Sequence, residues 1–251
     1  MTPVTTTTTN TKTVFQKAPL CGLLALVALL GGAGAGHAQL LGPTAYLAFD
    51  NTLPGAGGAI SPFSSLTFTS YFHLETFEDG LLNTPGVSAS VGSVLAPGST
   101  TDSVDADDGN IDGSGISGSS LAFSSSGGTI SFTFNGTTLG GLPTHAGIVW
   151  TDGSGAITFD AFDGSGTLIG SVGGTHADGN FFGGTAEDRF YGIIAPGGIG
   201  RISIRNATSG IEVDHLQYGR NSSAAAPEPS TLALLAVNGI ALFGVVRRKR
   251  Q

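Results

Sequence analysis

Short segments in which apolar and polar residues alternate recur through the middle of the chain. Residues 130–134 (Ile-Ser-Phe-Thr-Phe), 157–161 and 201–205 each place apolar side chains on one face and polar ones on the other, as half-buried β-strands do. Residues 147–150 (Gly-Ile-Val-Trp) are typical of a buried strand. No window of helical length shows an apolar repeat of 3.6 residues. These patterns predict an all-β region.

Further strands are expected where apolar residues recur between glycine-rich turns. Turn sequences such as Asp163-Gly164 and Pro196-Gly197-Gly198 separate the segments at short intervals. The further candidate strands are residues 45–49, 66–72, 74–77, 87–94, 168–172, 189–194 and 211–218. Many short strands joined by such turns indicate a β-sandwich or jelly roll over residues 39–220.

The last of these strands does not keep a simple alternation. Ile211 and Val213 share one face, whereas the next bulky residues, Leu216 and Tyr218, fall on the other. A β-bulge near Asp214-His215 would bring all four onto one face. Bulges often change the direction in which side chains point, so the bulge is a candidate position for a ligand site.

The N-terminal 38 residues have the pattern of an export signal. Lys12 and Lys17 form a positive flank before the apolar run 20–30, and small residues then end at Gly36-His37-Ala38. This arrangement predicts a signal peptide over residues 1–38, cut by signal peptidase between Ala38 and Gln39. The alternative is an uncleaved anchor, for which the apolar run is short.

The C-terminal end has three parts in a fixed order after a short linker, residues 221–226. Pro227-Glu228-Pro229 precedes the apolar segment 231–246, and the basic residues Arg247, Arg248, Lys249 and Arg250 follow it. As a helix, the apolar segment would rise about 24 Å, which makes it a marginal transmembrane span. The basic cluster favours a cytoplasmic C-terminus, with the large β region outside the membrane.

This tail resembles the PEP-CTERM sorting signal in the order and spacing of its parts. The resemblance covers residues 224–251, of which 227–251 form the sorting signal. The resemblance implies that an exosortase in the inner membrane of Gram-negative bacteria recognises the tail and removes it. It also implies an extracellular or cell-surface destination, often alongside exopolysaccharide and biofilm components. The alternative is a plain C-terminal anchor with an incidental Pro-Glu-Pro sequence. The tail indicates a route and not an activity.

Charge is distributed unevenly along the chain. The region from Gln39 to Ala226 contains no lysine and only four arginines against 17 acidic residues, a formal net charge of −13. A surface that binds nucleic acid needs clustered cations, so nucleic acid is excluded as a partner. An excess of carboxylate oxygens suits a hard cation such as Ca²⁺.

The densest acidic stretch contains a sequence that fits the start of a calcium-binding loop. Its candidate ligands are Asp105, Asp107, Asp108, Asn110 and Asp112. Asp108-Gly109-Asn110-Ile111-Asp112-Gly113 places oxygen ligands at alternate positions on a tight turn. The twelfth position is Ser119 and not a bidentate glutamate, which departs from an EF-hand. The alternative is a solvated acidic loop.

A second calcium site is suggested by analogy with jelly-roll modules, which often hold a structural calcium between their first and last strands. Its candidate ligands are Glu78, Asp79 and Asp214, the last beside the expected bulge. The alternative is that these acids lie in turns and on edge strands, facing water.

Catalysis has no signature in the sequence. The lone cysteine, Cys21, lies in the leader, so a thiol nucleophile is excluded from the mature region. The sequence contains neither the H-E-x-x-H pattern of a zinc site nor the G-x-S-x-G turn that carries a serine nucleophile. Trp150, Tyr191 and Tyr218 could stack on sugar rings, although Trp150 is expected in the core. We therefore expect a non-enzymatic extracellular protein, with exosortase and signal peptidase as export partners and calcium-dependent binding of extracellular polysaccharide. The alternative is a secreted polysaccharide-acting hydrolase, which would show two facing carboxylates in a cleft.

Overall fold

The structure is a computed structural model that describes residues 37–52, 58–105, 113–180 and 186–221. In these ranges the chain forms twelve strands and one short helix. They are β1 (Gln39–Ala45), β2 (Tyr71–Glu75), β3 (Val87–Ala89), β4 (Ser93–Leu95), β5 (Ser120–Phe123), β6 (Thr129–Phe134), α1 (Gly136–Leu139), β7 (His145–Gly153), β8 (Ile157–Phe162), β9 (Leu168–Gly174), β10 (Arg189–Ile194), β11 (Arg201–Asn206) and β12 (Ile211–Arg220).

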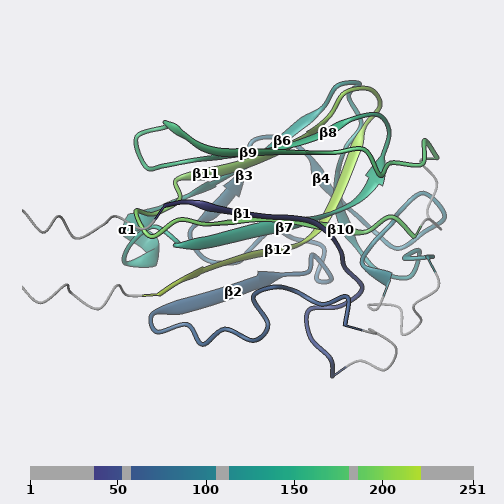
Figure 1. Cartoon of the computed structure of the whole chain (residues 1–251). Coiled ribbons are helices and arrows are strands. Elements are labelled where there is room, and N and C mark those ends of the chain that lie inside the picture. Colours follow the sequence, from purple (N-terminus) through teal and green to yellow (C-terminus); the bar gives the residue numbers. More distant parts are fainter. Residues whose placement is uncertain (1–36, 53–57, 106–112, 181–185, 222–251) are drawn as a thin grey trace, which may run out of the picture. The chain divides into compact units, whose positions relative to one another are not determined.

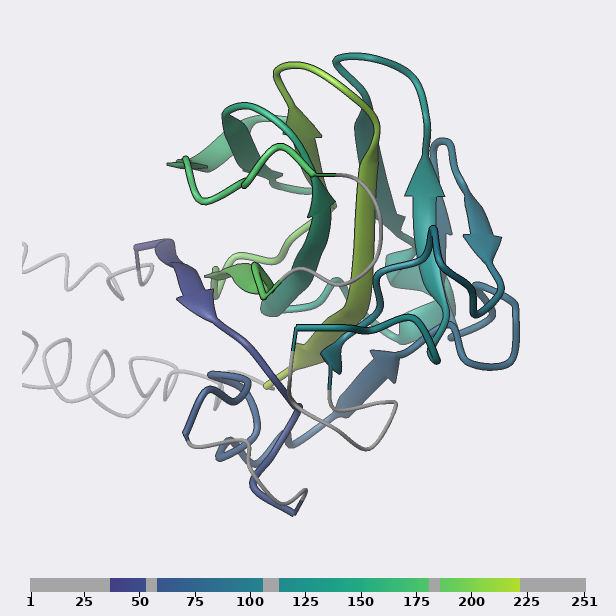
Figure 2. The ribbon, with the colours of Figure 1, turned by 90° about the vertical axis from the view of Figure 1, so that its right-hand side faces the viewer.

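The strands form two antiparallel sheets that lie one over the other as a sandwich (Figure 1). The larger sheet has the order β1-β10-β7-β12-β5-β4, and β2 also pairs with β12. The smaller sheet has the order β3-β6-β11-β8-β9. Figure 2 shows the long, yellow-green β12 inside the larger sheet. The predicted all-β sandwich is therefore confirmed.

The main core lies between the two sheets and is built from the apolar residues of the alternating strands. Ile130, Phe132 and Phe134 of β6 pack in the same cluster as Trp150 of β7. Along β8, buried residues alternate with more exposed ones, as the sequence pattern predicts. β11 departs from this pattern, because Ser203 is buried as well as Ile202 and Ile204. Burial of these side chains is the main stabilising contribution to the sandwich.

The larger sheet is also covered on its other face, which we call its outer face. Val149 of β7 and Phe190 of β10 form a second, smaller apolar cluster there. Tyr46, Phe63 and Val104, which come from the segments outside the sheet, complete this cluster. The polar residues Asp152, Glu212 and Asp214 on the outer face are therefore largely covered by protein.

Most predicted strands are found, with a few differences at their bounds. The predicted strand 45–49 is wrong, because the first strand is β1 at Gln39–Ala45. The predicted strands 66–72 and 74–77 are one strand, β2, and the predicted strand 87–94 is two short strands, β3 and β4. The sequence pattern does not predict β5 or α1.

The predicted bulge in the last strand is confirmed. The pairing of β12 with β7 shifts register between Asp214 and Gln217, and His215 has a positive φ of 44°. Ile211, Val213, Leu216 and Tyr218 all join the main core as a result. The other edge of β12 changes partner at the same place, from β5 before the bulge to β2 after it.

Two predicted segments fall largely outside the described residues. The export signal is described only at His37 and Ala38, and the predicted transmembrane helix 231–246 is not described at all. Within the part of the chain that the structure does describe, no helix has the length and apolar character needed to span a membrane.

Candidate functional site

Two acidic residues of β12 hold a loop segment against the outer face of the larger sheet. Glu212 Oε1 accepts a hydrogen bond of 2.8 Å from the backbone N–H of Asp102. Asp214 Oδ2 accepts one of 2.9 Å from the backbone N–H of Val104. The two acids lie two positions apart on the strand, so they match donors that lie two positions apart on the loop. Segment 101–105 therefore runs beside β12 with its carboxylates buried.

A second loop segment holds residues 101–105 from the other side. Asp105 Oδ2 accepts a hydrogen bond of 3.0 Å from Gly113 N–H. The backbone N–H and the hydroxyl of Ser103 both donate to the Gly115 carbonyl oxygen, at 3.1 and 2.7 Å. A side chain at position 115 would meet the Ser103 carbonyl oxygen at 2.0 Å, so this close approach of two backbones requires glycine.

Asp188, which directly precedes β10, lies near the aspartates of segment 101–105 and Asp214, in a buried position. Its side chain is only 2% exposed, and neither of its carboxylate oxygens has a hydrogen-bond partner among the described residues. Burial raises the pKa of Asp188 well above its usual range, and the charges of Asp102, Asp105 and Asp214 raise it further. The backbone N–H of Asp105 opposes these effects. We call Asp102, Asp105, Asp188 and Asp214 the aspartate cluster.

The basic residue closest to Asp188 in sequence does not neutralise the aspartate cluster. Arg189 directs its guanidinium to the backbone carbonyl oxygen of Asp188, at 2.8 Å. The Arg189 guanidinium therefore donates to the backbone oxygen of Asp188 and not to its carboxylate oxygens.

Three more buried carboxylates lie beside the aspartate cluster. Asp152 of β7 and Glu212 of β12 are directly paired across the two strands, which places their Cβ atoms about 5 Å apart. Burial raises the pKa of each to about 7. The charge of Asp178 adds to the shift of Asp152, and the charges of Asp152 and Asp102 add to the shift of Glu212. Burial also raises the pKa of Glu187 to about 8, and Asp178, Asp152 and Asp102 add to the shift.

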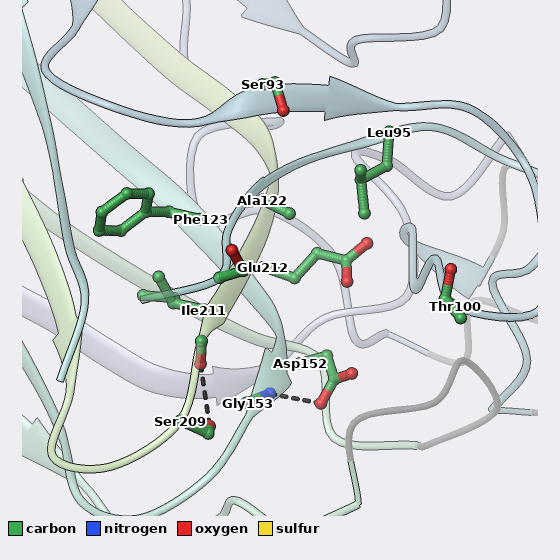
Figure 3. Close-up of a pocket in the computed structure, with 12 residues that line it drawn as sticks. Ser93, Leu95, Thr100, Ala122, Phe123, Asp152, Gly153, Ser209, Ile211 and Glu212 are labelled. Carbon is green, nitrogen blue, oxygen red and sulfur yellow. Dashed lines mark hydrogen bonds between the residues drawn. The ribbon is translucent and has the colours of Figure 1, made fainter. Parts of the chain in front are cut away.

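Asp152 and Glu212 line an open pocket with a volume of about 480 Å³. In Figure 3 their carboxylates extend to the same side of the strands, and the Phe123 ring lies on the opposite side of the pocket. The pocket is lined by Ser93, Leu95, Thr100, Ala122, Phe123, Ser124, Asp152, Gly153, Ser209, Gly210, Ile211 and Glu212. It combines an apolar ring with hydroxyl and carboxyl groups, as binding sites for amphipathic small molecules do.

The carboxylates that line the pocket are held by specific hydrogen bonds. Glu212 Oε1 accepts from the Ser120 hydroxyl as well as from Asp102 N–H, and Asp152 Oδ1 accepts from Gly153 N–H. The same glutamate therefore contacts the pocket and the segment that carries the aspartate cluster.

The residues predicted for the second calcium site are held by different partners. Glu78 Oε1 accepts from Ser119 N–H at 2.7 Å. Asp79 caps its own turn by accepting from Leu81 N–H at 3.0 Å and from the Asn83 side chain at 2.5 Å. Asp214 lies in the aspartate cluster.

Of the residues predicted for the calcium loop, the structure describes only Asp105, which also belongs to the aspartate cluster. Asp107, Asp108, Asn110 and Asp112 lie outside the described residues. So do Pro227, Glu228, Pro229 and the basic residues 247–250 of the tail. In the described ranges, no three His, Cys, Asp or Glu side chains are gathered closely enough to enclose a metal ion by themselves.

The aromatic residues considered for sugar stacking are buried. Trp150, Tyr191 and Tyr218 are fully enclosed in the main core. Their polar atoms bond to protein groups: Trp150 to Asn206, Tyr191 to His176 and Tyr218 to the Pro85 carbonyl. The interpretation of Tyr191 and Tyr218 as sugar-stacking residues is therefore wrong, whereas Trp150 is in the core as expected.

Sequence reasoning missed several residues of the site: Asp102, Asp152, Glu187, Asp188 and Glu212. Glu212 and Asp214 alternate with the apolar Ile211 and Val213, which is the pattern of a strand with one face in water. Loops cover that face instead, and no local pattern shows this. Asp152 opens an Asp-Gly-Ser-Gly sequence identical to that of Asp163, whose carboxylate organises an exposed turn.

Comparison with known protein families gives a match at the C-terminal end of the chain. The profile of the PEP-CTERM protein-sorting motif matches residues 225–251. The chain carries a PEP-CTERM sorting signal. The predicted resemblance is thus confirmed for the tail. No curated protein matches the sequence of this PEP-CTERM protein.

Solved structures match this PEP-CTERM protein only at low identity and low TM-score. TmCBM61 in complex with β-1,4-galactotriose is 16% identical, with a TM-score of 0.30, over 58% of this chain and 95% of that one. The catalytic unit of the GH87 α-1,3-glucanase from Streptomyces thermodiastaticus is 15% identical, with a TM-score of 0.32, over 66% of this chain and 29% of that one. Tailspike protein 4 of bacteriophage CBA120 is also 15% identical, with a TM-score of 0.32, over 64% of this chain and 22% of that one. The chain therefore spans under a third of the length of the latter two.

Proposed function

We propose that this protein is a non-enzymatic component of the extracellular matrix or biofilm that an exosortase sorts to the cell surface. The observation that carries the proposal is the PEP-CTERM motif at residues 225–251, which follows a β-sandwich whose last strand ends at Arg220. A large acidic domain joined directly to a sorting signal is the arrangement expected of a delivered surface protein.

The proposed route has three steps. Signal peptidase cuts between Ala38 and Gln39 during export. The helix 231–246 then holds the chain in the inner membrane, with residues 247–250 in the cytoplasm. Exosortase finally removes the tail and releases the sandwich to the outside.

Variants of the Pro-Glu-Pro sequence test this route. Glu228→Ala, or replacement of Pro227 and Pro229 by alanine, should leave the protein in the membrane fraction with its tail attached. Thr231→Ser is the matched control beside the motif, and it should be processed normally. Unchanged release and trimming of the Glu228→Ala and proline variants in the native host would contradict exosortase sorting.

Outside the cell, the proposed ligand of the sandwich is a polysaccharide that enters the pocket of Asp152 and Glu212. The support is the pairing of carboxyl and hydroxyl groups with the Phe123 ring in an open concavity, because sugars present hydroxyl groups and apolar ring faces together. Phe123→Ala and Glu212→Gln should each weaken retention on the producer's exopolysaccharide. An equal retention of both variants and the unmodified protein would exclude this pocket as the binding site.

One observation favours a second candidate function, a polysaccharide-acting hydrolase. Asp152 and Glu212 form a cross-strand carboxyl pair in an open pocket, with the pKa of each raised to about 7. Such a pair can supply one protonated and one ionised carboxyl group near neutral pH, as glycosidases require. Release of reducing ends from the exopolysaccharide, lost in both Asp152→Asn and Glu212→Gln, would establish this function. Binding without release would leave the non-enzymatic proposal standing.

A further inference from the structure

We propose that the aspartate cluster, Asp102, Asp105, Asp188 and Asp214, is a binding site for a divalent cation of the calcium type. The ion would lie between the outer face of the larger sheet and segment 101–105. This site differs from both calcium sites expected from the sequence, because it joins one residue of each with Asp102 and Asp188.

The buried carboxylate of Asp188 forms no hydrogen bond with the residues that the structure describes. Nearly all buried polar groups in proteins are hydrogen-bonded, and an isolated buried charge is strongly destabilising. Neither Asp188 oxygen has a hydrogen-bond partner among the described residues, and the other three aspartates of the cluster act on it as like charges. A bound cation would satisfy these oxygens and remove the repulsion.

Glu75 shows how the same fold treats a buried carboxylate that needs no cation. It is also nearly inaccessible, at 5% exposure. Its oxygens accept hydrogen bonds from the backbone N–H groups of Phe77, Asn83 and Thr84, at 3.0–3.1 Å. Three backbone N–H groups thus bond to Glu75, whereas only the Asp105 N–H favours the ionised form of Asp188, against burial and three like charges.

The four aspartates come from three separate segments of the chain. Asp102 and Asp105 lie on one loop, Asp188 precedes β10, and Asp214 lies on β12 beside the bulge at His215. An ion here would join three segments that are far apart in sequence. It would add to the hydrogen bonds from Val104 and Asp102 that already hold the loop to β12.

The chemistry of the ligands selects the class of ion. The cluster offers only carboxylate oxygens, which suit hard cations and disfavour zinc and copper, for which nitrogen or sulfur ligands are preferred. Calcium takes six to eight oxygen ligands in flexible geometry and accepts backbone carbonyls and water among them. This flexibility is required, because the described carboxylates do not enclose a point by themselves and would have to close around the ion.

The test is calcium binding by the full chain, purified in detergent and freed of metal with EDTA. Calorimetric titration with CaCl₂ should show one tight site per chain and a rise in the melting temperature, whereas MgCl₂ should bind far more weakly. Asp188→Asn should lower the calcium affinity at least about tenfold. In EDTA the same variant should melt above the unmodified protein, because it removes a carboxyl group whose ionised form is destabilised by burial and by three like charges.

Matched variants keep the test decisive. Glu75→Gln changes a buried carboxylate outside the cluster and should leave the calcium affinity unchanged. Asp102→Asn serves as a second cluster variant if Asp188→Asn does not fold, and it should also weaken calcium binding. Absence of calcium binding, or an unchanged affinity in the cluster variants that fold, would overturn the proposal. Either result would leave the proposed sorting route unaffected, because that route depends on the N-terminal signal and the C-terminal tail and not on the aspartate cluster.

Discussion

Trp150 of β7 and Asn206 at the end of β11 join the two sheets of the sandwich through a single hydrogen bond. The indole Nε1–H donates to Asn206 Oδ1 at 2.8 Å, and the Trp150 side chain is completely buried. Asn206 in turn donates to the backbone carbonyl oxygen of Gly210. The bond therefore fixes the largest side chain of the core to the turn that precedes β12.

We predict that Asn206→Leu destabilises the fold by about 1–3 kcal/mol, because it leaves the buried indole N–H without an acceptor. Trp150→Phe with Asn206→Leu in the same chain should be less destabilising than the sum of the two single changes, since neither polar group then remains. Urea unfolding of the three variants measures this. Additive effects would show that the bond contributes little to stability.

A second prediction concerns pH and His176, whose Nε2 lies 2.8 Å from the Tyr191 hydroxyl oxygen. Burial lowers the pKa of His176 from 6.5 to about 4, and the charge of Arg189 adds to this shift. The unfolded chain therefore takes up the proton first as the pH falls. The resulting contribution to stability is complete above pH 6.5 and is lost as the pH falls towards 4.

His176→Gln should therefore lose less stability than the unmodified protein between pH 7 and pH 4.5. The pKa values of His73 and His145 are also lowered by burial, so a part of the decline should remain in the variant. Urea unfolding at several pH values gives the difference between the two proteins. Parallel curves would contradict the assignment of this pH dependence to His176.

A third prediction concerns the backbone at the bulge. His215 has a φ of 44°, a conformation that is unfavourable for β-branched residues. Its Nδ1 lies 2.8 Å from the Tyr46 hydroxyl oxygen. His215→Gly and His215→Val both remove this contact, so a comparison of the two isolates the backbone effect. The valine variant should be less stable by about 1 kcal/mol or more, and equal melting temperatures would contradict this.

A fourth prediction separates the aspartate cluster from the calcium loop expected from the sequence. Asp108→Asn and Asp112→Asn change only the loop, whereas Asp188→Asn changes only the cluster. We expect calorimetry to give an unchanged calcium affinity for the two loop variants. A loss of affinity in the loop variants and not in Asp188→Asn would place the ion in the loop.

The sequence predicted the layers of the fold well, because each layer follows from local alternation. Residues 130–134 and 201–205 alternate between apolar and polar side chains, as strands do, and they are most of β6 and of β11. The bulge was also predictable, since four large apolar residues of the last strand need one common face. Residues 45–49 were misassigned because Tyr46 and Ala48 are buried by loops and not by pairing in a sheet.

The site was less predictable, because its acids are buried by segments that are distant in the sequence. Glu212 and Asp214 occupy the polar positions of an alternating strand, and nothing near them indicates that segment 101–105 covers them. Asp188 gives no local signal at all, since the three aspartates that act on it come from two other parts of the chain. Asp105 and Asp214 were singled out for separate sites, and the structure brings them into one cluster.

The most direct test of the proposed export and sorting is the mass of the mature protein recovered from the surface of its producing cells. The account predicts an N-terminus at Gln39 and the absence of the apolar and basic tail, residues 231–251. The Glu228→Ala variant should keep the tail and remain in the membrane. A mature protein that ends at Gln251, with the same mass in the variant, would contradict sorting by an exosortase.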